Sequence, residues 1–149
     1  MTLTRWSDIW LNEGFATFAE WQWSHRSPTS RALLLTTYWS AWNARSRPLA
    51  GPTARTLFGH TTYVRGGTML LGLQLLMGDR AFLAMVREWT TAHRFGNVTT
   101  DDFLALARLR GGTGAEAYLR RWLYGSKRPP LGAALTGRLQ ALGVKVPRR

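Results

Sequence analysis

The sequence predicts an all-α protein, and three features of its pattern support this fold class. Apolar side chains recur at helical spacing, capping residues and Gly or Pro breakers separate these stretches, and no period-2 run of useful length indicates a strand. With 149 residues and 45% apolar content, the chain is long enough to bury a core. Since no repeat or linker divides it, we predict a single helical domain over residues 1–149.

The first two helices are expected in the N-terminal third of the chain. Ser7 or Asp8 is a candidate N-cap for a helix that runs to about Ser24. A second helix is expected from Pro28 through "TSRALLLTTYWSAWNARS", because proline suits a first-turn position that needs no N–H. The segment "RPLAGP" then breaks it. The apolar residues at helical spacing on this second helix are Leu34, Tyr38, Trp39 and Trp42.

Two further helices are expected in the middle of the chain, joined almost directly. The third begins near Thr61 or Thr62 and ends at Gly78. Asp79 is expected to cap the fourth. The apolar face of this fourth helix holds Met85, Val86 and Trp89.

The C-terminal third is expected to hold shorter helices. After a turn at "FGNV", Thr99 or Thr100 caps "DDFLALARLRGG", which stops at its two glycines. A short helix follows from Ala115 to Tyr124 and ends at "GSKRPP". The tail from Leu131 is expected to form one more weak helix.

Composition narrows the function classes. The formal charge is +12, with 20 Lys and Arg against 8 Asp and Glu. A basic surface could attract nucleic acid or an acidic partner, but the arginines are scattered and no nucleic-acid-binding motif accompanies them, so compositional bias is the simpler interpretation. We therefore assign no clear nucleic-acid partner.

The sequence also limits the cellular compartment and the kinds of metal site that are possible. No run of about 18 apolar residues indicates a membrane span, and "MTLTRW" does not resemble a signal peptide, so a cytoplasmic location is expected. The absence of cysteine excludes disulfides and thiolate metal sites. Any metal must therefore be held by His, Glu or Asp.

The first helix carries a polar stripe among large apolar side chains. Glu13, Thr17, Glu20 and Ser24 recur at helical spacing in "WSDIWLNEGFATFAEWQWS", and we expect this helix to be buried on most sides. A carboxylate in such surroundings must be paired, protonated or bound to a metal. Periodicity alone favours an arginine partner.

The residues of two segments are more specific than the stripe. "WSDIWLNEGFA" resembles the stretch that follows the HExxH helix in the M1 family of zinc aminopeptidases, which are of the gluzincin type. In that family a Glu of the "LNEGFA"-like segment is the third zinc ligand. The matching residue here is Glu13. "TTYVRGGTMLLGLQLLMGD" resembles the family's Tyr-x-(Lys/Arg)-Gly segment, whose tyrosine stabilises the oxyanion; the matching residue is Tyr63. "FGNVTTDDFLAL" and "WLYGSKRPPL" also resemble M1 sequences, whereas the basic tail, 131–149, is least supported.

This resemblance implies a fold and a function. The fold is the helical C-terminal half of a thermolysin-like M1 catalytic domain. The function is that of a zinc metallopeptidase that removes N-terminal residues from peptides. Glu20 becomes a candidate for an acid that supports the zinc ligands from two turns away, and an ion pair with an arginine remains its alternative role.

The sequence also departs from the family pattern. No HExxH occurs, and His25, His60 and His93 stand alone, each interpreted as a surface or satisfied residue rather than a ligand. The GAMEN-like segment that holds the substrate amine is absent. Counting eighteen residues back from Glu13 places the second histidine of the motif before Met1, so the N-terminal half-domain is expected to be missing from this chain.

Two classes of function therefore remain open. The chain is either part of a peptidase, inactive until joined to its other half, or a non-catalytic helical remnant or basic interaction module. Zinc affinity distinguishes the two. We also expect self-association, because removing half of a domain exposes apolar surface.

Overall fold

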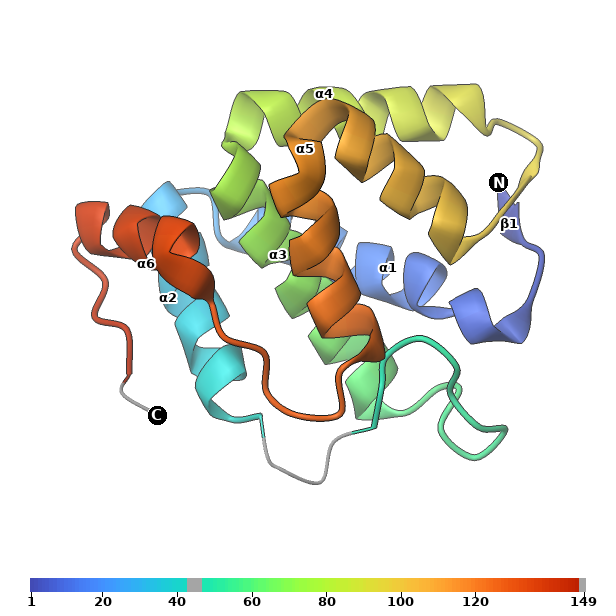
Figure 1. Ribbon diagram of the computed structural model, residues 1–149, viewed down its shortest axis with the longest axis horizontal. Helices are drawn as coiled ribbons and strands as arrows, with labels where there is room; N and C mark the ends of the chain where they lie inside the picture. Colours follow the sequence, from blue (N-terminus) through green and yellow to red (C-terminus); the bar gives the residue numbers. More distant parts are fainter. Residues whose placement is uncertain (43–46, 148–149) are drawn as a thin grey trace.

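The computed structural model describes residues 1–42 and 47–147, and this part of the chain is helical as predicted. Its elements follow one another with short connections, except before η2 (Figure 1). In chain order they are β1 (Thr2–Leu3), the 3-10 helix η1 (Trp6–Asp8), α1 (Trp10–Ser24), α2 (Pro28–Ser40), the π-helix η2 (Thr61–Arg65), α3 (Gly66–Met77), α4 (Asp79–Ala92), β2 (Asn97–Val98), α5 (Thr100–Tyr124) and α6 (Gly132–Ala141).

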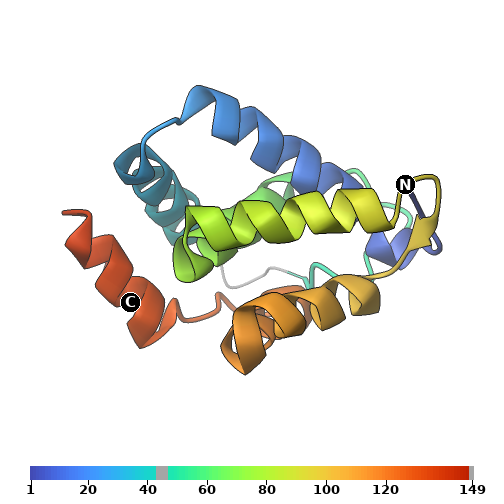
Figure 2. The same ribbon diagram turned by 90° about the horizontal axis from the view of Figure 1, so that it is seen from above.

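Helix α3 is the centre of the fold. It contacts α1, α2, α4, α5 and α6, and the two ribbon views show it between α1 and α2 on one side and α5 on the other (Figures 1 and 2). Every residue from Gly66 to Leu75 is buried. The sequence "GGTMLLGLQLL" is apolar all round rather than on one stripe, which is what a helix enclosed on all sides requires.

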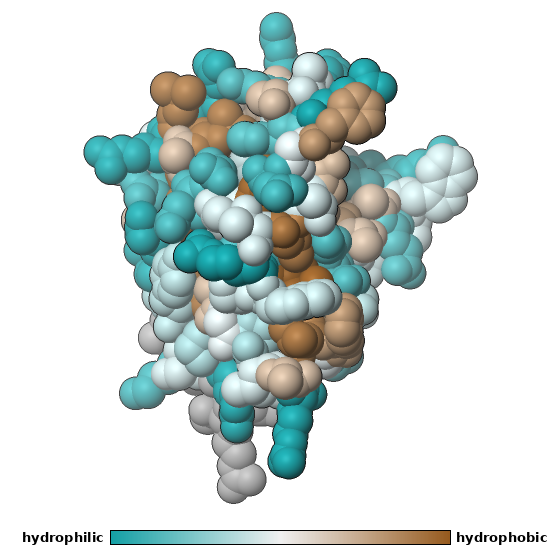
Figure 3. All heavy atoms as spheres, turned by 90° about the vertical axis from the view of Figure 1, so that its right-hand side faces the viewer, coloured by the Kyte–Doolittle hydropathy of each residue, from teal (hydrophilic) through white to brown (hydrophobic). Residues whose placement is uncertain are grey.

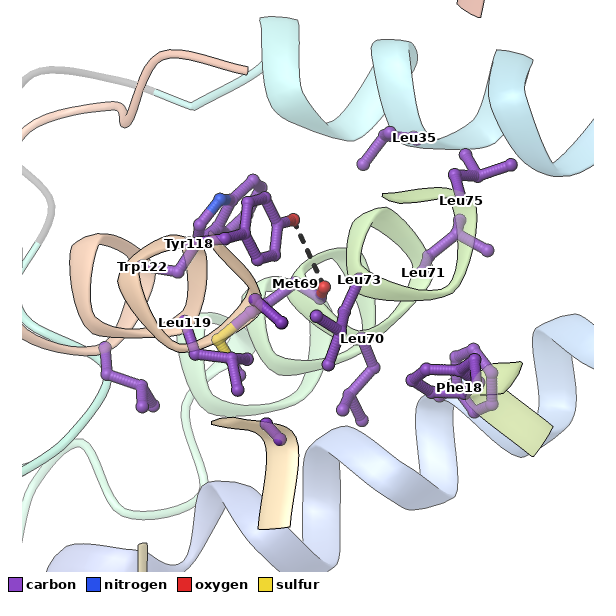
Figure 4. Packing of buried hydrophobic residues seen from close by; sticks show 14 of the residues in the cluster. Phe18, Leu35, Met69, Leu70, Leu71, Leu73, Leu75, Tyr118, Leu119 and Trp122 are labelled. Atoms are coloured by element: carbon purple, nitrogen blue, oxygen red, sulfur yellow. Dashed lines mark hydrogen bonds between the residues drawn. The ribbon is translucent and has the colours of Figure 1, made fainter. Parts of the chain in front are cut away.

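Side chains from three other helices meet the surface of α3. Phe18 of α1, Leu35 of α2, and Tyr118 with Trp122 of α5 point toward it (Figure 4). The hydroxyl of the fully buried Tyr118 donates a hydrogen bond to the Met69 carbonyl at 3.2 Å. The only polar end of this large side chain is thus satisfied inside the core.

Several predicted boundaries are confirmed. The Oγ of Ser27 accepts a hydrogen bond from the Ser30 N–H at 3.1 Å at the start of α2, directly before Pro28. Thr99 and Asp102 form a capping box at the start of α5. The predicted stop at the glycine pair is a kink inside α5, where Gly112 takes a φ of 73° and separates two helical segments.

The prediction that Ser7 or Asp8 caps the first helix is wrong. The N-cap of α1 is Ile9, with no side-chain hydrogen bond. The buried Asp8 carboxylate instead accepts hydrogen bonds from the N–H and the hydroxyl of Thr100, at 3.2 and 2.6 Å, and Trp10 Nε1 donates to the Thr100 hydroxyl at 2.9 Å. Asp8 therefore satisfies the N-terminus of α5, which is distant in the sequence.

Two further helix boundaries differ from the predictions. Gly78 is at once the C-cap of α3 and the N-cap of α4, so Asp79 is the first helical residue rather than the cap. Its carboxylate pairs with the buried Arg31 at 2.5 Å. Helix α2 ends at Ser40, so Trp42 lies beyond it, and the rest of the predicted extension, residues 43–46, lies outside the described residues.

Two short strands add a parallel pair that the sequence pattern did not predict. Thr2 is in register with Asn97 and Leu3 with Val98. Two residues are too few to show a period-2 pattern. The pair fixes the N-terminus beside the turn between α4 and α5 (Figure 1).

The expectation that α1 is buried on most sides is also wrong. Its buried residues lie on one face, and Trp23 on the other side is 77% exposed. Apolar residues run down the middle of the face drawn in Figure 3. A second exposed aromatic group consists of Trp6 and Phe58, which are 65% and 61% exposed and pack edge to face with centroids 6.3 Å apart.

None of the helices in the described residues has the length and apolar content needed to cross a membrane.

Candidate active site

Two glycines let α1 approach the start of α3 at backbone contact. A Cβ on Gly66 would lie 2.8 Å from the Gly14 Cα, and a Cβ on Gly14 would lie 2.9 Å from the Gly66 Cα. Gly67 is packed as closely against the side chains of Thr17 and Trp21. These distances are shorter than ordinary carbon contacts of about 3.5–4.0 Å, so only glycine fits at this crossing.

The crossing brings together the two segments singled out in the sequence. Glu13 directly precedes Gly14 on α1, and Tyr63 lies three residues before Gly66, inside the π-helix η2. A single turn of π-helix is uncommon and is frequently found at functional sites. Its N-terminal end is held by the buried Thr62, whose N–H donates to the Gly59 carbonyl at 2.8 Å.

Glu13 and Tyr63 are neighbours across this crossing, and both side chains are half-buried. The pKa of the Tyr63 hydroxyl is raised above its ordinary value, first by partial burial and then by hydrogen bonding to, and the negative charge of, the Glu13 carboxylate. Both effects disfavour the phenolate. The hydroxyl therefore stays protonated at neutral pH and can donate a hydrogen bond.

The structure places Glu20 two turns further along α1, where it is exposed. Its carbonyl accepts a hydrogen bond from Ser24, but in residues 1–42 and 47–147 no ion pair involves its carboxylate. Neither of the two roles considered for Glu20 is therefore seen within this part of the chain.

The three histidines are far from forming a ligand set. His25 contacts the Ser24 hydroxyl at 2.9 Å, His60 is exposed before η2, and His93 packs against the Trp89 ring. Among the described residues there is no group of three His, Cys, Asp or Glu side chains that could hold a metal ion. A catalytic zinc takes three protein ligands of this kind, so these residues alone do not fit one.

Sequence reasoning missed two parts of this region. The glycines of the two motifs were visible as letters, but their mutual contact needs coordinates. Arg65, also in the second motif, was not singled out; it is buried, and its guanidinium lies over the Trp42 ring with its carbon 3.3 Å from the ring centroid. Its position within "YVRGG" was the one available signal.

Comparisons with known proteins match both segments to one family. The family model described as the peptidase family M1 domain matches residues 1–122. The aminopeptidase N of Streptomyces lividans is 28% identical over 141 residues, which cover 83% of this chain and 16% of that protein. A probable aminopeptidase 2 of Sulfurisphaera tokodaii is 24% identical and covers 83% of this chain and 17% of its own length.

Solved structures agree with the sequence relatives. An M1 zinc metallopeptidase from Deinococcus radiodurans, crystallised with a Tyr-Ser-Ala substrate, is 34% identical with a TM-score of 0.74 over 87% of this chain. The chain covers 30% of that structure and therefore spans less than a third of the length of these relatives. Because the family model covers more than half of the chain, from Met1 to Trp122, the chain belongs to peptidase family M1.

Proposed function

We propose that this chain is the helical part of the catalytic domain of an M1 zinc aminopeptidase, which hydrolyses N-terminal residues from peptides. The observation that carries the proposal is the meeting of Glu13 and Tyr63 beside the glycine crossing of α1 and α3. These two residues come from separate motifs and are fifty positions apart in the chain. Their meeting is what a shared site requires.

Glu13 supplies one zinc ligand in this proposal. A carboxylate oxygen suits zinc, and a rigid helix packed against α3 fixes its position. A zinc ion held there would supply Lewis-acid chemistry, by polarising the scissile carbonyl and lowering the pKa of a water molecule. The other two ligands would come from an HExxH segment that these 149 residues do not contain, so the chain alone is expected to be inactive and to bind zinc weakly.

Tyr63 stabilises negative charge on the carbonyl oxygen as the peptide bond is attacked. A well-aimed donor of this kind contributes about 3 kcal/mol to transition-state stabilisation. The raised pKa of its hydroxyl supports this role, because the group remains a donor at the pH at which peptides are hydrolysed. Glu20 stays a candidate supporting acid only, since it is exposed and has no ion-pair partner in the described chain.

The relatives support a peptide substrate. The Deinococcus radiodurans enzyme was crystallised with Tyr-Ser-Ala, and the relatives from Streptomyces and Sulfurisphaera are named as aminopeptidases. A cytoplasmic location remains a prediction from the sequence.

The alternative is a helical module without catalytic activity. The incomplete metal set of the described residues and the charge of +12 favour it. The two proposals differ in what the chain does once the HExxH half is supplied.

The proposal can be tested with a fusion protein. In it, the HExxH-containing segment of the Deinococcus radiodurans relative is joined to the N-terminus of this chain. We expect chelator-sensitive cleavage of an aminoacyl reporter and one zinc per molecule. Glu13→Gln should lose metal, whereas Tyr63→Phe should keep zinc and lower kcat with little change in KM, because it removes only a transition-state donor. A folded fusion that binds no zinc, or a Tyr63→Phe variant with full rate, would contradict the proposed roles.

The chain by itself offers a second test, the ionisation of Tyr63. Absorbance titration with and without Tyr63→Phe isolates its phenolate signal. Glu13→Gln should lower the pKa of Tyr63 toward its ordinary value, because the anionic neighbour is removed. Glu20→Gln, a matched change on the same helix, should leave it in place. Equal effects of the two changes would show that Glu13 does not face Tyr63.

A further inference from the structure

Two arginines are buried among residues 1–42 and 47–147, and only one of them has a counter-charge there. Arg31 and Arg65 are 5% and 7% exposed. The guanidinium of Arg31 pairs with the Asp79 carboxylate and also donates to the Arg26 carbonyl at 2.8 Å. The guanidinium of Arg65 stacks on Trp42 and donates from Nη1 to the Arg47 carbonyl.

The rest of the Arg65 guanidinium finds no acceptor in the part of the chain that the structure describes. Its Nε and Nη2 are buried without a hydrogen-bond partner there, and so are the indole Nε1 atoms of Trp42 and of Trp122, which packs edge to face on Trp42 at 5.2 Å. Four of the six such atoms found in residues 1–42 and 47–147 thus lie in one contiguous cluster. All four carry N–H donors, and an unsatisfied buried donor costs about 1–3 kcal/mol.

Within the described residues, no carboxylate pairs with this cluster. Of its eight acids, four form ion pairs with other arginines, and none of the eight forms an ion pair with Arg65 in the described residues. The sequence places no acid between Trp42 and Arg47. Burial lowers the pKa of Arg65 to about 9, and no neighbouring acid raises it again. No carboxylate of residues 1–42 and 47–147 therefore accepts from this cluster, and a bound ligand can supply the acceptor.

A pocket beside the cluster is large enough to admit one. Arg65 and Trp42 line it together with Tyr38, Thr61 and Thr68, and its volume is about 110 Å³. One water molecule needs roughly 10–15 Å³. Tyr63 is not among the lining residues, so the pocket shares the π-helix with the candidate active site without being part of it.

We propose that this pocket binds a small carboxylate, which accepts hydrogen bonds from the Arg65 guanidinium and the Trp42 indole N–H. A carboxylate matches the paired donors of a guanidinium in geometry and compensates its charge. A single neutral acceptor would match only one donor. The carboxylate comes either from a free small acid or from the C-terminus of a short peptide.

NMR of the uniformly ¹⁵N-labelled chain tests this directly. Buried Arg Nε–H and Trp Nε1–H groups give separate signals, assigned through bonds, and the chain is titrated with sodium acetate and, in parallel, with sodium chloride at matched ionic strength. We expect saturable shifts of the Arg65 and Trp42 signals, with acetate at least tenfold more effective than chloride. The Arg31 guanidinium is equally buried, but its Nη2 already pairs with the Asp79 carboxylate, so its Nε–H signal is the internal control and should not move.

Further titrations identify where the carboxylate comes from and which residue binds it. Tri-alanine should bind more tightly than acetate if a peptide terminus is the ligand, and its C-terminal amide should not bind in either case. Arg65→Lys should abolish the Trp42 shift. No saturable shift, equal shifts with chloride, equal shifts at Arg31, or binding of the amide would overturn the proposal; the wild-type titration decides it alone if the variant does not fold.

Discussion

A single methyl group added at the glycine crossing between α1 and α3 should destabilise the protein, because it would meet backbone atoms. In Gly66→Ala, the new Cβ would lie 2.8 Å from the Gly14 Cα, 3.4 Å from its nitrogen and 3.6 Å from the Trp10 carbonyl oxygen. All three atoms belong to backbone, so no side chain can rotate away. Relief of the closest contact requires the helices to separate by about 1 Å, given ordinary carbon contacts of about 3.5–4.0 Å.

The size of the effect follows from comparison with a harmless glycine. Overpacking of this kind costs about 1–3 kcal/mol. Gly137 lies in α6, and a methyl group added there would meet nothing within 4 Å, so Gly137→Ala gains only the helix preference of alanine, about 0.5–1 kcal/mol. Both changes share that gain, and the difference between the two variants isolates the clash at about 1–3 kcal/mol.

Urea unfolding followed by circular dichroism measures the difference. We expect Gly66→Ala to unfold at lower denaturant than Gly137→Ala, and Gly14→Ala to behave like Gly66→Ala, because its Cβ meets the Gly66 Cα at 2.9 Å. The pKa of Tyr63 should also fall toward its ordinary value as the helices part. A Gly66→Ala protein as stable as Gly137→Ala would refute the argument that backbone contact holds these segments together.

Three more outcomes are expected. Thr99→Ala should lower the free energy of unfolding by about 1 kcal/mol through loss of the capping box. Hydrogen bonding to Thr99 lowers the pKa of Asp102, so the part of this stabilisation that depends on the Asp102 carboxylate is present above the ordinary pKa of that acid and is lost as the pH falls through its folded pKa. The difference in stability between the two proteins should therefore be smaller in acid. Asp79→Asn should lower the melting temperature more than Asp101→Asn does, because it leaves the Arg31 guanidinium buried without a counter-charge; equal melting temperatures would contradict this. The exposed aromatic groups should make the chain self-associate, so its melting temperature should change with protein concentration, and a concentration-independent monomer would argue against this.

Most of the fold could be predicted from the sequence because its helix boundaries are local. Ser27 with Pro28, Thr99 with Asp102, and the bend at Gly112 depend on residues within one turn of each other. The wrong N-cap of α1 has a different cause. The carboxylate of Asp8 was assigned to the nearest helix, but it serves one that begins 92 residues later, which local pattern cannot show.

The candidate site could be predicted only as two separate segments. Glu13 and Tyr63 were identified from motifs, and the structure shows why they meet, through glycines that the motifs also contain. The environment of Arg65 could not be predicted, because it depends on the absence of any nearby acid among the described residues, and spatial absence has no sequence pattern. The burial of α1 was overestimated for a related reason, because the amino-acid composition of a helix does not show which of its faces pack against other helices.

The hydrogen bonds from Thr100 to Asp8 also constrain the order of folding. Closing a loop of 92 residues costs about 4 kcal/mol in chain entropy, plus a constant, from the logarithmic dependence on loop length. Two or three hydrogen bonds, toward the lower end of about 0.5–3 kcal/mol each, do not offset this cost, so we expect them to form after the intervening helices have docked and shortened the loop. The segment around Asp8 is therefore expected to be among the last to dock. Substitution of Asp8 should accelerate unfolding while leaving the refolding rate nearly unchanged, as stopped-flow kinetics can measure.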